Sequence, residues 1–172
     1  MKNTILFGDC RDTLPNIDTK ARMCVTSPPY YGLRDYGGED NQIGQEDTPE
    51  QFIENLVEVF RSVRDVLTDD GTLWVNIGDS YYNYRPGKGQ ALVKQSVSKT
   101  KQDLPDKCAR RGNKLEGLKE KDLIGIPWML AFALRADGWY LRQDIIWHKP
   151  NPMPESVRDR CTKAHEYIFL LS

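Results

Sequence analysis

The sequence contains no apolar run that approaches the length of a membrane span, and its first residues lack the apolar core of a signal peptide. Its four cysteines lie far apart and form no CxxC pair, as expected of reduced thiols in the cytoplasm. The net charge of −1 shows no overall excess of positive charge, so any basic surface must be local. These absences predict a soluble cytoplasmic protein without a membrane segment.

Metal and phosphate motifs are also missing. Cys161 and His165 have the spacing of two zinc ligands on one helical turn, but the sequence offers no second pair, so we expect no metal site. Residues 85–89 (Arg-Pro-Gly-Lys-Gly) lack the GxxxxGK[ST] spacing of a phosphate-binding P-loop. No internal repeat is visible.

What the sequence does contain matches one globular domain. Its 172 residues are 39% hydrophobic and 28% charged, which is sufficient for a buried core. Strand and helix patterns alternate along it. The expected strands cover residues 3–8, 21–25, 72–77, 139–147 and 167–171, and the two longer helices cover 48–68 and 126–138. This order predicts an α/β sheet of Rossmann type that binds ligands at its carboxyl edge, where the loops after Val25, Ile77 and Trp147 meet.

The helix that follows Thr48 carries the clearest signals. Threonine at the cap, proline at the first helical position and glutamine at the third form a capping-box pattern. Apolar residues then recur at helical spacing from Phe52 to Leu67, and residues 69–71 (Asp-Asp-Gly) end the pattern. We assign this helix to core packing.

Residues 81–121 interrupt the alternation. They hold eleven lysines and arginines against four acids, a local charge of +7. A basic, polar segment of this kind is typical of a flexible loop, and it also suits a loop that contacts the phosphates of a nucleic acid. We expect a single domain over residues 1–172 that carries this basic flexible insertion.

Residues 26–30 (Thr-Ser-Pro-Pro-Tyr) follow the apolar end of the strand over 21–25. Because proline fixes φ and has no N–H, the carbonyls of this segment point outward instead of into a strand ladder. The segment therefore forms a rigid row of acceptors, suited to an amino group on a flat ring.

Two neighbouring features leave alternatives open. Asp9 follows the expected strand over 3–8. Either Asp9 binds a ligand at the carboxyl edge, or Asp9 or Asp12 caps the short helix that leads to Leu14. Residues 32–38 are rich in glycine, which indicates either a mobile loop over a site or an exposed surface loop.

Residues 26–30 resemble the catalytic (D/N/S)PP(Y/F/W) motif of DNA amino-methyltransferases. Residues 5–9 resemble the strand and Gly-Asp element that precedes this motif in the permuted beta group of that family. Residues 70–76 resemble the next strand, and residues 146–151 resemble the loop that contacts the extruded base. The resemblance covers the chain outside the basic insertion, and it implies a Rossmann-like, S-adenosylmethionine-dependent methyltransferase sheet.

One family element is missing. In the beta group, an FxGxG sequence that binds the methionine part of S-adenosylmethionine lies C-terminal to the catalytic motif, and no such sequence follows Tyr30. We therefore expect the chain to be the N-terminal part of a longer enzyme or a truncated reading frame, with an incomplete catalytic domain.

The resemblance implies roles for the motif residues. The four catalytic residues it implies are Ser27, Pro28, Pro29 and Tyr30. The side chain of Ser27 and the carbonyl of Pro28 would accept hydrogen bonds from the target amino group, and Tyr30 would stack on the base. Implied contacts to S-adenosylmethionine come from Asp9, Ser27 and Pro28. Implied contacts to the substrate nucleotide come from Tyr30, Trp147, Lys149 and Asn151.

The implied substrate is double-stranded DNA, in a bacterial or phage-encoded enzyme that a cognate restriction endonuclease could accompany. Serine at the first motif position favours cytosine N4 over adenine N6. Methylation at carbon 5 needs a cysteine nucleophile in a Pro-Cys pair, which the sequence lacks. Two other functions stay open: methylation of a protein glutamine, which the serine and the basic insertion disfavour, and DNA binding by a non-catalytic fragment.

Overall fold

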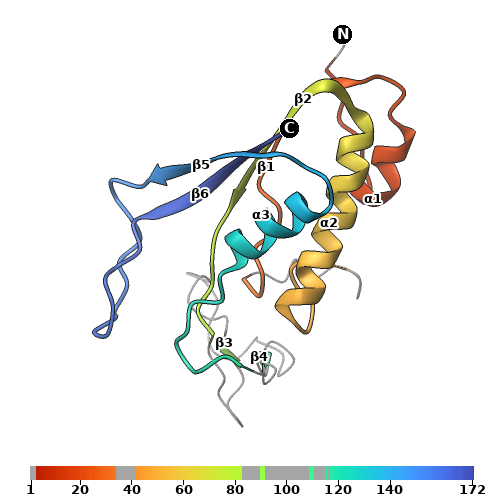
Figure 1. The fold of residues 1–172 in the computed structure, drawn as a ribbon. Coiled ribbons are helices and arrows are strands. Elements are labelled where there is room, and N and C mark those ends of the chain that lie inside the picture. Colours follow the sequence, from red (N-terminus) through yellow and green to blue (C-terminus); the bar gives the residue numbers. More distant parts are fainter. Residues whose placement is uncertain (1–2, 34–41, 83–89, 92–108, 111–114, 116) are drawn as a thin grey trace.

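The computed structural model describes residues 3–33, 42–82, 90–91, 109–110, 115 and 117–172. Its main sheet has four strands in the order β1-β2-β6-β5 (Figure 1). The strands are β1 (Ala21–Thr26), β2 (Leu67–Ile77), β5 (Leu141–His148) and β6 (His165–Leu171). β1 runs parallel to β2, and β6 runs antiparallel to both of its neighbours. β1, β2 and β5 therefore end at the same edge of a mixed α/β sheet.

Helix α2 (Pro49–Val66) forms as its sequence signals predict. The Thr48 hydroxyl accepts a hydrogen bond from the Gln51 N–H at 3.2 Å, which satisfies one of the free donors of the first turn. The apolar face of the helix is buried, with Phe52, Leu56 and Phe60 at most 2% exposed. Burial of each such side chain contributes about 1.5–3 kcal/mol, so packing stabilises this helix more than its cap does.

Helix α3 (Ile126–Ala136) begins after Gly125, which has a φ of +88°. Its first N–H groups point at Asp79, which follows β2. One Asp79 carboxylate oxygen accepts from the backbone N–H of Gly125 at 3.0 Å and of Ile126 at 3.1 Å. The start of α3 is thus tied to the carboxyl end of β2. The sequence had indicated the helix but not this contact.

The core lies between one face of the sheet and the two longer helices, α2 and α3 (Figure 1). Alternate residues of β2 and β6 point into it, and all are at most 1% exposed: Leu73, Val75, Ile77, Phe169 and Leu171. This alternation is the period of a strand that has one face in the core. No helix in the described part of the chain has both the length and the apolar character needed to cross a membrane.

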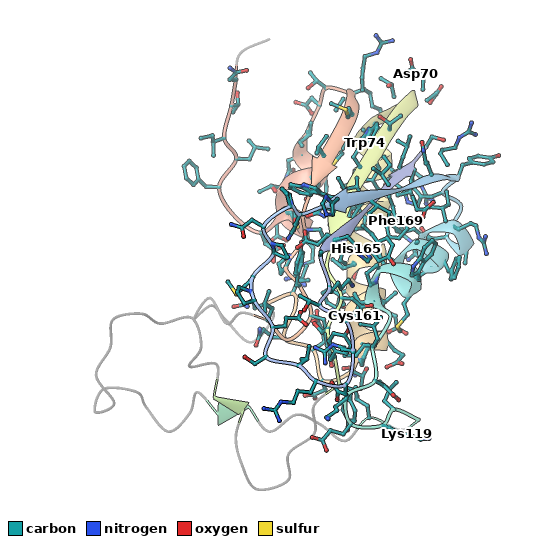
Figure 2. The ribbon with its side chains drawn as sticks, turned by 90° about the vertical axis from the view of Figure 1, so that its left-hand side faces the viewer. Asp70, Trp74, Lys119, Cys161, His165 and Phe169 are labelled. Carbon is teal, nitrogen blue, oxygen red and sulfur yellow. The ribbon has the colours of Figure 1, made fainter. Side chains whose placement is uncertain are left out.

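The strand expected over residues 3–8 is absent. Figure 2 shows these residues as an extended segment apart from the sheet, and Ile5 and Phe7 are 79% and 90% exposed. An apolar segment becomes a strand only when another backbone pairs with it, and no described strand does so. Helix α1 (Cys10–Thr13) and a 3₁₀ turn, η1 (Leu14–Asn16), follow the segment.

Strand β2 begins five residues before the expected start at Thr72, because Leu67 pairs with Ala21 and Thr72 pairs with Met23. The Asp-Asp-Gly segment expected to separate helix and strand is instead a bulge inside β2. Glycine at position 71 suits this bulge, since a Cβ there would lie 2.8 Å from the Thr68 carbonyl oxygen.

The other two strands differ slightly from their expected ranges: β5 starts two residues later than residue 139, and β6 starts two residues earlier than residue 167. The basic insertion at 81–121 lies mostly outside the described residues. Within it, the short strands β3 (Gln90–Ala91) and β4 (Ala109–Arg110) pair antiparallel. Residues 34–38 of the glycine-rich loop also lie outside the described part.

Candidate functional site

The carboxyl edge of the sheet brings several chain segments together, as the sequence predicts. β1 leads into residues 26–30, β2 leads into Gly78, and β5 leads into Lys149. β6 starts at the same edge, because it runs antiparallel to β2 and β5. The proline motif and Lys149 therefore reach one region from distant positions in the sequence.

The sheet face that points away from α2 and α3 is here called the open face. Strand register places Val25 beside Trp74, and Trp147 beside Glu166, on this face, which also carries Asn76. In the described ranges, no helix packs on it. Side chains at the carboxyl edge of the open face are therefore accessible to a ligand.

Tyr30 is the centre of a hydrogen-bond network on the open face. Its hydroxyl lies 3.1 Å from Asn76 Oδ1 and 3.1 Å from Glu166 Oε2, and both are acceptors. Asn76 Nδ2 donates to the Tyr167 carbonyl at 3.1 Å, which orients the amide so that its oxygen points toward Tyr30. The second Glu166 oxygen accepts from the Lys149 ammonium. The network joins the predicted Tyr30 and Lys149 through residues that the sequence analysis had not singled out.

The ring of Tyr30 lies directly against Gly78, the first residue after β2. A Cβ at position 78 would be 2.5 Å from Tyr30 Cε2, so any side chain there would displace the ring. Gly44 packs against the same motif, and a Cβ on it would lie 3.2 Å from both Pro29 Cβ and the Tyr30 carbonyl oxygen. The motif is therefore packed closely between two glycines, Gly78 and Gly44, where a side chain would not fit.

Burial and neighbouring charges shift the pKa values of Tyr30 and Glu166 in opposite directions. Burial raises the pKa of the Tyr30 hydroxyl; a hydrogen bond with Ser27 acts in the opposite direction, and the neighbouring Glu166 carboxylate raises the pKa further. Burial alone would raise the pKa of Glu166. Hydrogen bonds from Lys149, Tyr30 and Asn76 and the charge of Lys149 outweigh it, so the Glu166 pKa lies below its ordinary value. At neutral pH the network thus holds a neutral phenol beside an ionised carboxylate.

The other motif residues lie where a ligand can reach them. The Ser27 side chain is exposed at the end of β1, and Pro28 and Pro29 are partly buried. Trp147 is 50% exposed, and the Lys149 ammonium lies 5.9 Å from the centre of its ring. Asn151 is exposed in the loop after β5. This edge offers acceptors, an aromatic surface and a cation, which together suit a planar nitrogenous ligand.

Asp9 has a different set of contacts. Its carboxylate accepts from the Arg11 N–H at 2.8 Å and pairs with the Arg11 guanidinium at 2.5 Å. The hydrogen bonds from Arg11 lower the Asp9 pKa to about 2. The interpretation of Asp9 as the cap of the short helix α1 is confirmed. No described contact joins Asp9 to the Tyr30 network.

The spacing of Cys161 and His165 does not correspond to a helical turn. Residues 161–164 have no helical structure, and His165 begins β6, where its ring contacts Tyr167 at 5.2 Å between centres. Figure 2 shows Cys161 and His165 at separate levels along this part of the chain. Within the described ranges, no group of three or more His, Cys, Asp or Glu side chains is placed to hold a metal ion.

Sequence reasoning missed three residues of the site: Asn76, Gly78 and Glu166. Each had a weak signal. Asn76 is a polar residue inside an otherwise apolar strand, Gly78 follows that strand directly, and Glu166 stands next to the apolar run of β6. Asn76 lies 46 residues and Glu166 136 residues from Tyr30 in sequence, so spacing could not connect them to the motif.

Comparisons with known proteins agree on one family. A family model described as DNA methylase, N6_N4_Mtase, matches residues 21–172. Over 98% of its length, the chain is 54% identical to the type II methyltransferase M.SmaI of Serratia marcescens and 52% identical to M.Cfr9I of Citrobacter freundii. It covers 55% and 54% of those two proteins, so it spans about half the length of these curated relatives.

Two solved structures share the fold. One is TTHA0409 of Thermus thermophilus, described as a putative DNA modification methylase, complexed with S-adenosyl-L-methionine. It has a TM-score of 0.58 and 22% identity, over 95% of this chain and 50% of that one. The other is the cytosine-N4-specific PvuII DNA methyltransferase, with a TM-score of 0.61 and 14% identity, over 96% of this chain and 47% of that one.

Proposed function

The chain belongs to the N6/N4 DNA methylase family, and from this we propose that it forms the target-base part of a type II DNA methyltransferase. The reaction would transfer a methyl group from S-adenosylmethionine to the exocyclic amino group of a base in double-stranded DNA. The observation that carries this proposal is the Ser-Pro-Pro-Tyr segment at the carboxyl edge, with its tyrosine held by Asn76 and Glu166. We assign residues 1–172 to a single, incomplete catalytic domain of Rossmann-like type.

The chemical task is to make a poor nucleophile reactive. The lone pair of an exocyclic amino nitrogen is delocalised into the ring of the base. Hydrogen bonds from this amino group to the Ser27 hydroxyl and the Pro28 carbonyl, both outside the ring plane, would localise the pair on nitrogen. The two acceptors would orient the nitrogen toward the methyl group that bound S-adenosylmethionine would supply, and the base would form no covalent bond to the protein. Catalysis would therefore rest on orientation and electrostatic stabilisation.

Extrusion of the base from the duplex costs a few kcal/mol and requires a pocket with aromatic surface. Tyr30 and Trp147 would supply that surface on the open face, while Lys149 and Asn151 would contact the nucleotide. The insertion over 81–121, with its charge of +7, would neutralise phosphates of the DNA.

The described residues fit part of a site for S-adenosylmethionine. The exposed hydroxyl of Ser27 and the carbonyl of Pro28 lie at the end of β1, an edge strand, where a polar cofactor can approach. Asp9, the third expected contact, is paired with Arg11 and would have to give up this ion pair to bind the cofactor. When bound, the cofactor supplies an electrophilic methyl group.

We infer cytosine N4 as the acceptor, with adenine N6 as the alternative. The serine of the motif supports cytosine, and one structure with the same fold is described as cytosine-N4-specific. By analogy with the type II relatives, the enzyme would act in the bacterial cytoplasm beside a restriction endonuclease that recognises the same site.

The test is methyl transfer from labelled S-adenosylmethionine to duplex DNA by the protein as its gene encodes it. Nucleosides from the product are then separated by mass. We expect N4-methylcytosine, and about a hundredfold lower rate for Ser27→Ala, because one hydrogen bond to the reacting group is lost. Ser156→Ala, in an exposed loop, is the matched control and should keep full activity. N6-methyladenine would reverse the base assignment, and label on protein but not on DNA would overturn the proposal.

A second candidate is a DNA-binding fragment without catalysis, which the coverage of only 55% of the M.SmaI relative favours. Calorimetry on the 172-residue chain separates the two. DNA binding without measurable S-adenosylmethionine binding indicates a fragment, whereas binding of both indicates a cofactor site within these residues.

A further inference from the structure

We propose that Glu166 is a positioning residue of the base pocket, whose carboxylate, anchored by Lys149, determines where the Tyr30 ring stands. The inference rests on the proposed function, since the position of Tyr30 affects methyl transfer only if a base stacks on it. Glu166 itself is not assigned a contact with the substrate.

The location of Glu166 suits this role. β6 lies between β2 and β5, and Glu166 is its second residue, at the carboxyl edge where the motif and Lys149 arrive. Its register partner on β5 is Trp147, so both side chains stand on the open face. One carboxylate oxygen faces Tyr30 and the other faces Lys149. Glu166 thus links the loop after β1 to the loop after β5.

The Tyr30 hydroxyl has one hydrogen and two acceptors at the same distance, Asn76 Oδ1 and Glu166 Oε2, each at 3.1 Å. Hydrogen bonds to an ionised acceptor are roughly twice as strong as neutral ones, so the hydroxyl donates mainly to Glu166. The carboxylate is held in place by the Lys149 ammonium, and its side chain is only 19% exposed. An acceptor that is itself fixed by an ion pair can fix the tyrosine.

Two contacts then define the plane of the ring. Gly78 supports the ring at the Cδ2–Cε2 edge, and Glu166 holds the hydroxyl at its far end. Without Glu166, the hydroxyl would lose its ionised acceptor and keep only its neutral partners, Asn76 and Ser27, and the ring could tilt. A base stacked on a tilted ring would present its amino group to Ser27 and Pro28 at the wrong angle. Misalignment of a reacting group lowers the rate of the reaction.

The kinetic test uses the protein as encoded, with Glu166→Ala and Glu166→Gln. We expect kcat for DNA methylation to fall about tenfold or more in Glu166→Ala, while KM for S-adenosylmethionine stays within about twofold. Glu166→Gln keeps the size of the side chain and an acceptor oxygen, so its kcat should lie between that of the unsubstituted protein and that of Glu166→Ala. Glu155→Ala is the matched control, because Glu155 pairs with Arg160 in the loop between β5 and β6. It should leave kcat unchanged.

A double-mutant comparison separates positioning from a general structural effect. Tyr30→Phe lacks the hydroxyl, so Glu166→Ala should reduce kcat little further in that background. Equal losses in both backgrounds would overturn the inference, as would full activity of Glu166→Ala.

An NMR measurement tests the position of Tyr30 without depending on activity. Tyrosine labelled with ¹³C at Cζ gives one signal per residue, and the Tyr30 signal is the one that Tyr30→Phe removes. We expect Glu166→Ala to shift it, and Glu155→Ala to leave it in place. If the unsubstituted protein methylates no DNA, the proposed function fails, and this signal alone decides whether Glu166 holds Tyr30. An unmoved signal overturns the positioning.

Discussion

The aromatic residue of the motif depends on its neighbours for its position. Tyr30 is flanked by Gly78, bonded by Asn76 and Glu166, and reached by Lys149 through that glutamate. None of these groups is charged and isolated, since the carboxylate and the ammonium neutralise each other. The network therefore fixes a neutral phenol without an unpaired buried charge, which would cost several kcal/mol.

Gly78→Ala tests how tightly the ring is held. The new Cβ would lie 2.5 Å from Tyr30 Cε2, so the ring must move. We expect a loss of about 1–3 kcal/mol in the free energy of unfolding, measured in urea, together with about tenfold lower methylation. In a Tyr30→Ala background the same substitution should cost little stability, because the clash is gone. An equal cost in both backgrounds would show that Tyr30 is not the residue displaced.

At the scale of elements, two helices form one side of the molecule and each begins at a different kind of cap. α2 carries its own cap in Thr48, so its start is encoded locally. α3 has glycine at the cap position and no side-chain cap of its own. It relies on Asp79, 46 residues earlier, which accepts from the N–H groups of Ser80, Gly125 and Ile126. This contact couples α3 to the strand that leads into the site.

Asp79→Ala removes the acceptor of the α3 terminus. We expect the free energy of unfolding to fall by about 1–2 kcal/mol, because backbone donors at a helix start lose their partner. Asp79→Asn keeps an oxygen in the same place and should cost less. Asp122→Ala is the control, since this carboxylate accepts from the backbone N–H of Lys119 and from no N–H of a longer helix in the part of the chain that the structure describes. Chemical denaturation of the three variants gives the comparison, and equal losses at both positions would contradict the assigned role of Asp79.

At the scale of the whole molecule, the sheet is covered on one side and open on the other. Among the described strands β1 stands at the edge of the sheet, and Met23 and Val25 on it are 57% and 69% exposed. Ile5 and Phe7, before α1, are also exposed. Exposed apolar groups along a strand with free N–H and C=O groups favour association with another backbone.

We expect the 172-residue chain, expressed alone, to self-associate through this edge. Val25→Lys should reduce the association seen in sedimentation velocity, because a charge at an edge strand opposes pairing. Thermal stability should not fall, since Val25 is largely exposed. Leu123→Lys, at a residue 46% exposed outside the sheet, is the control and should leave association unchanged. A monomeric unsubstituted chain, or equal effects of the two lysines, would contradict this.

The sequence by itself was sufficient wherever the cause is local. The cap at Thr48 and the apolar spacing after it predict α2, and the alternation of elements predicts an α/β sheet with its loops at one edge. The proline motif pointed to the family that the comparisons confirm. In each case the residues that decide the outcome lie within one segment, or the order of segments alone is decisive.

Only the tertiary structure decided what depends on pairing between distant segments. Residues 3–8 have the composition of a strand, but no described strand pairs with them. The bulge in β2 follows from register with β1, which no pattern within residues 67–77 reveals. Tyr30 meets Glu166 across 136 positions, because β6 returns antiparallel to the edge where β1 ends. The motif marks where the chemistry would occur, and strand order selects the residues that hold it in place.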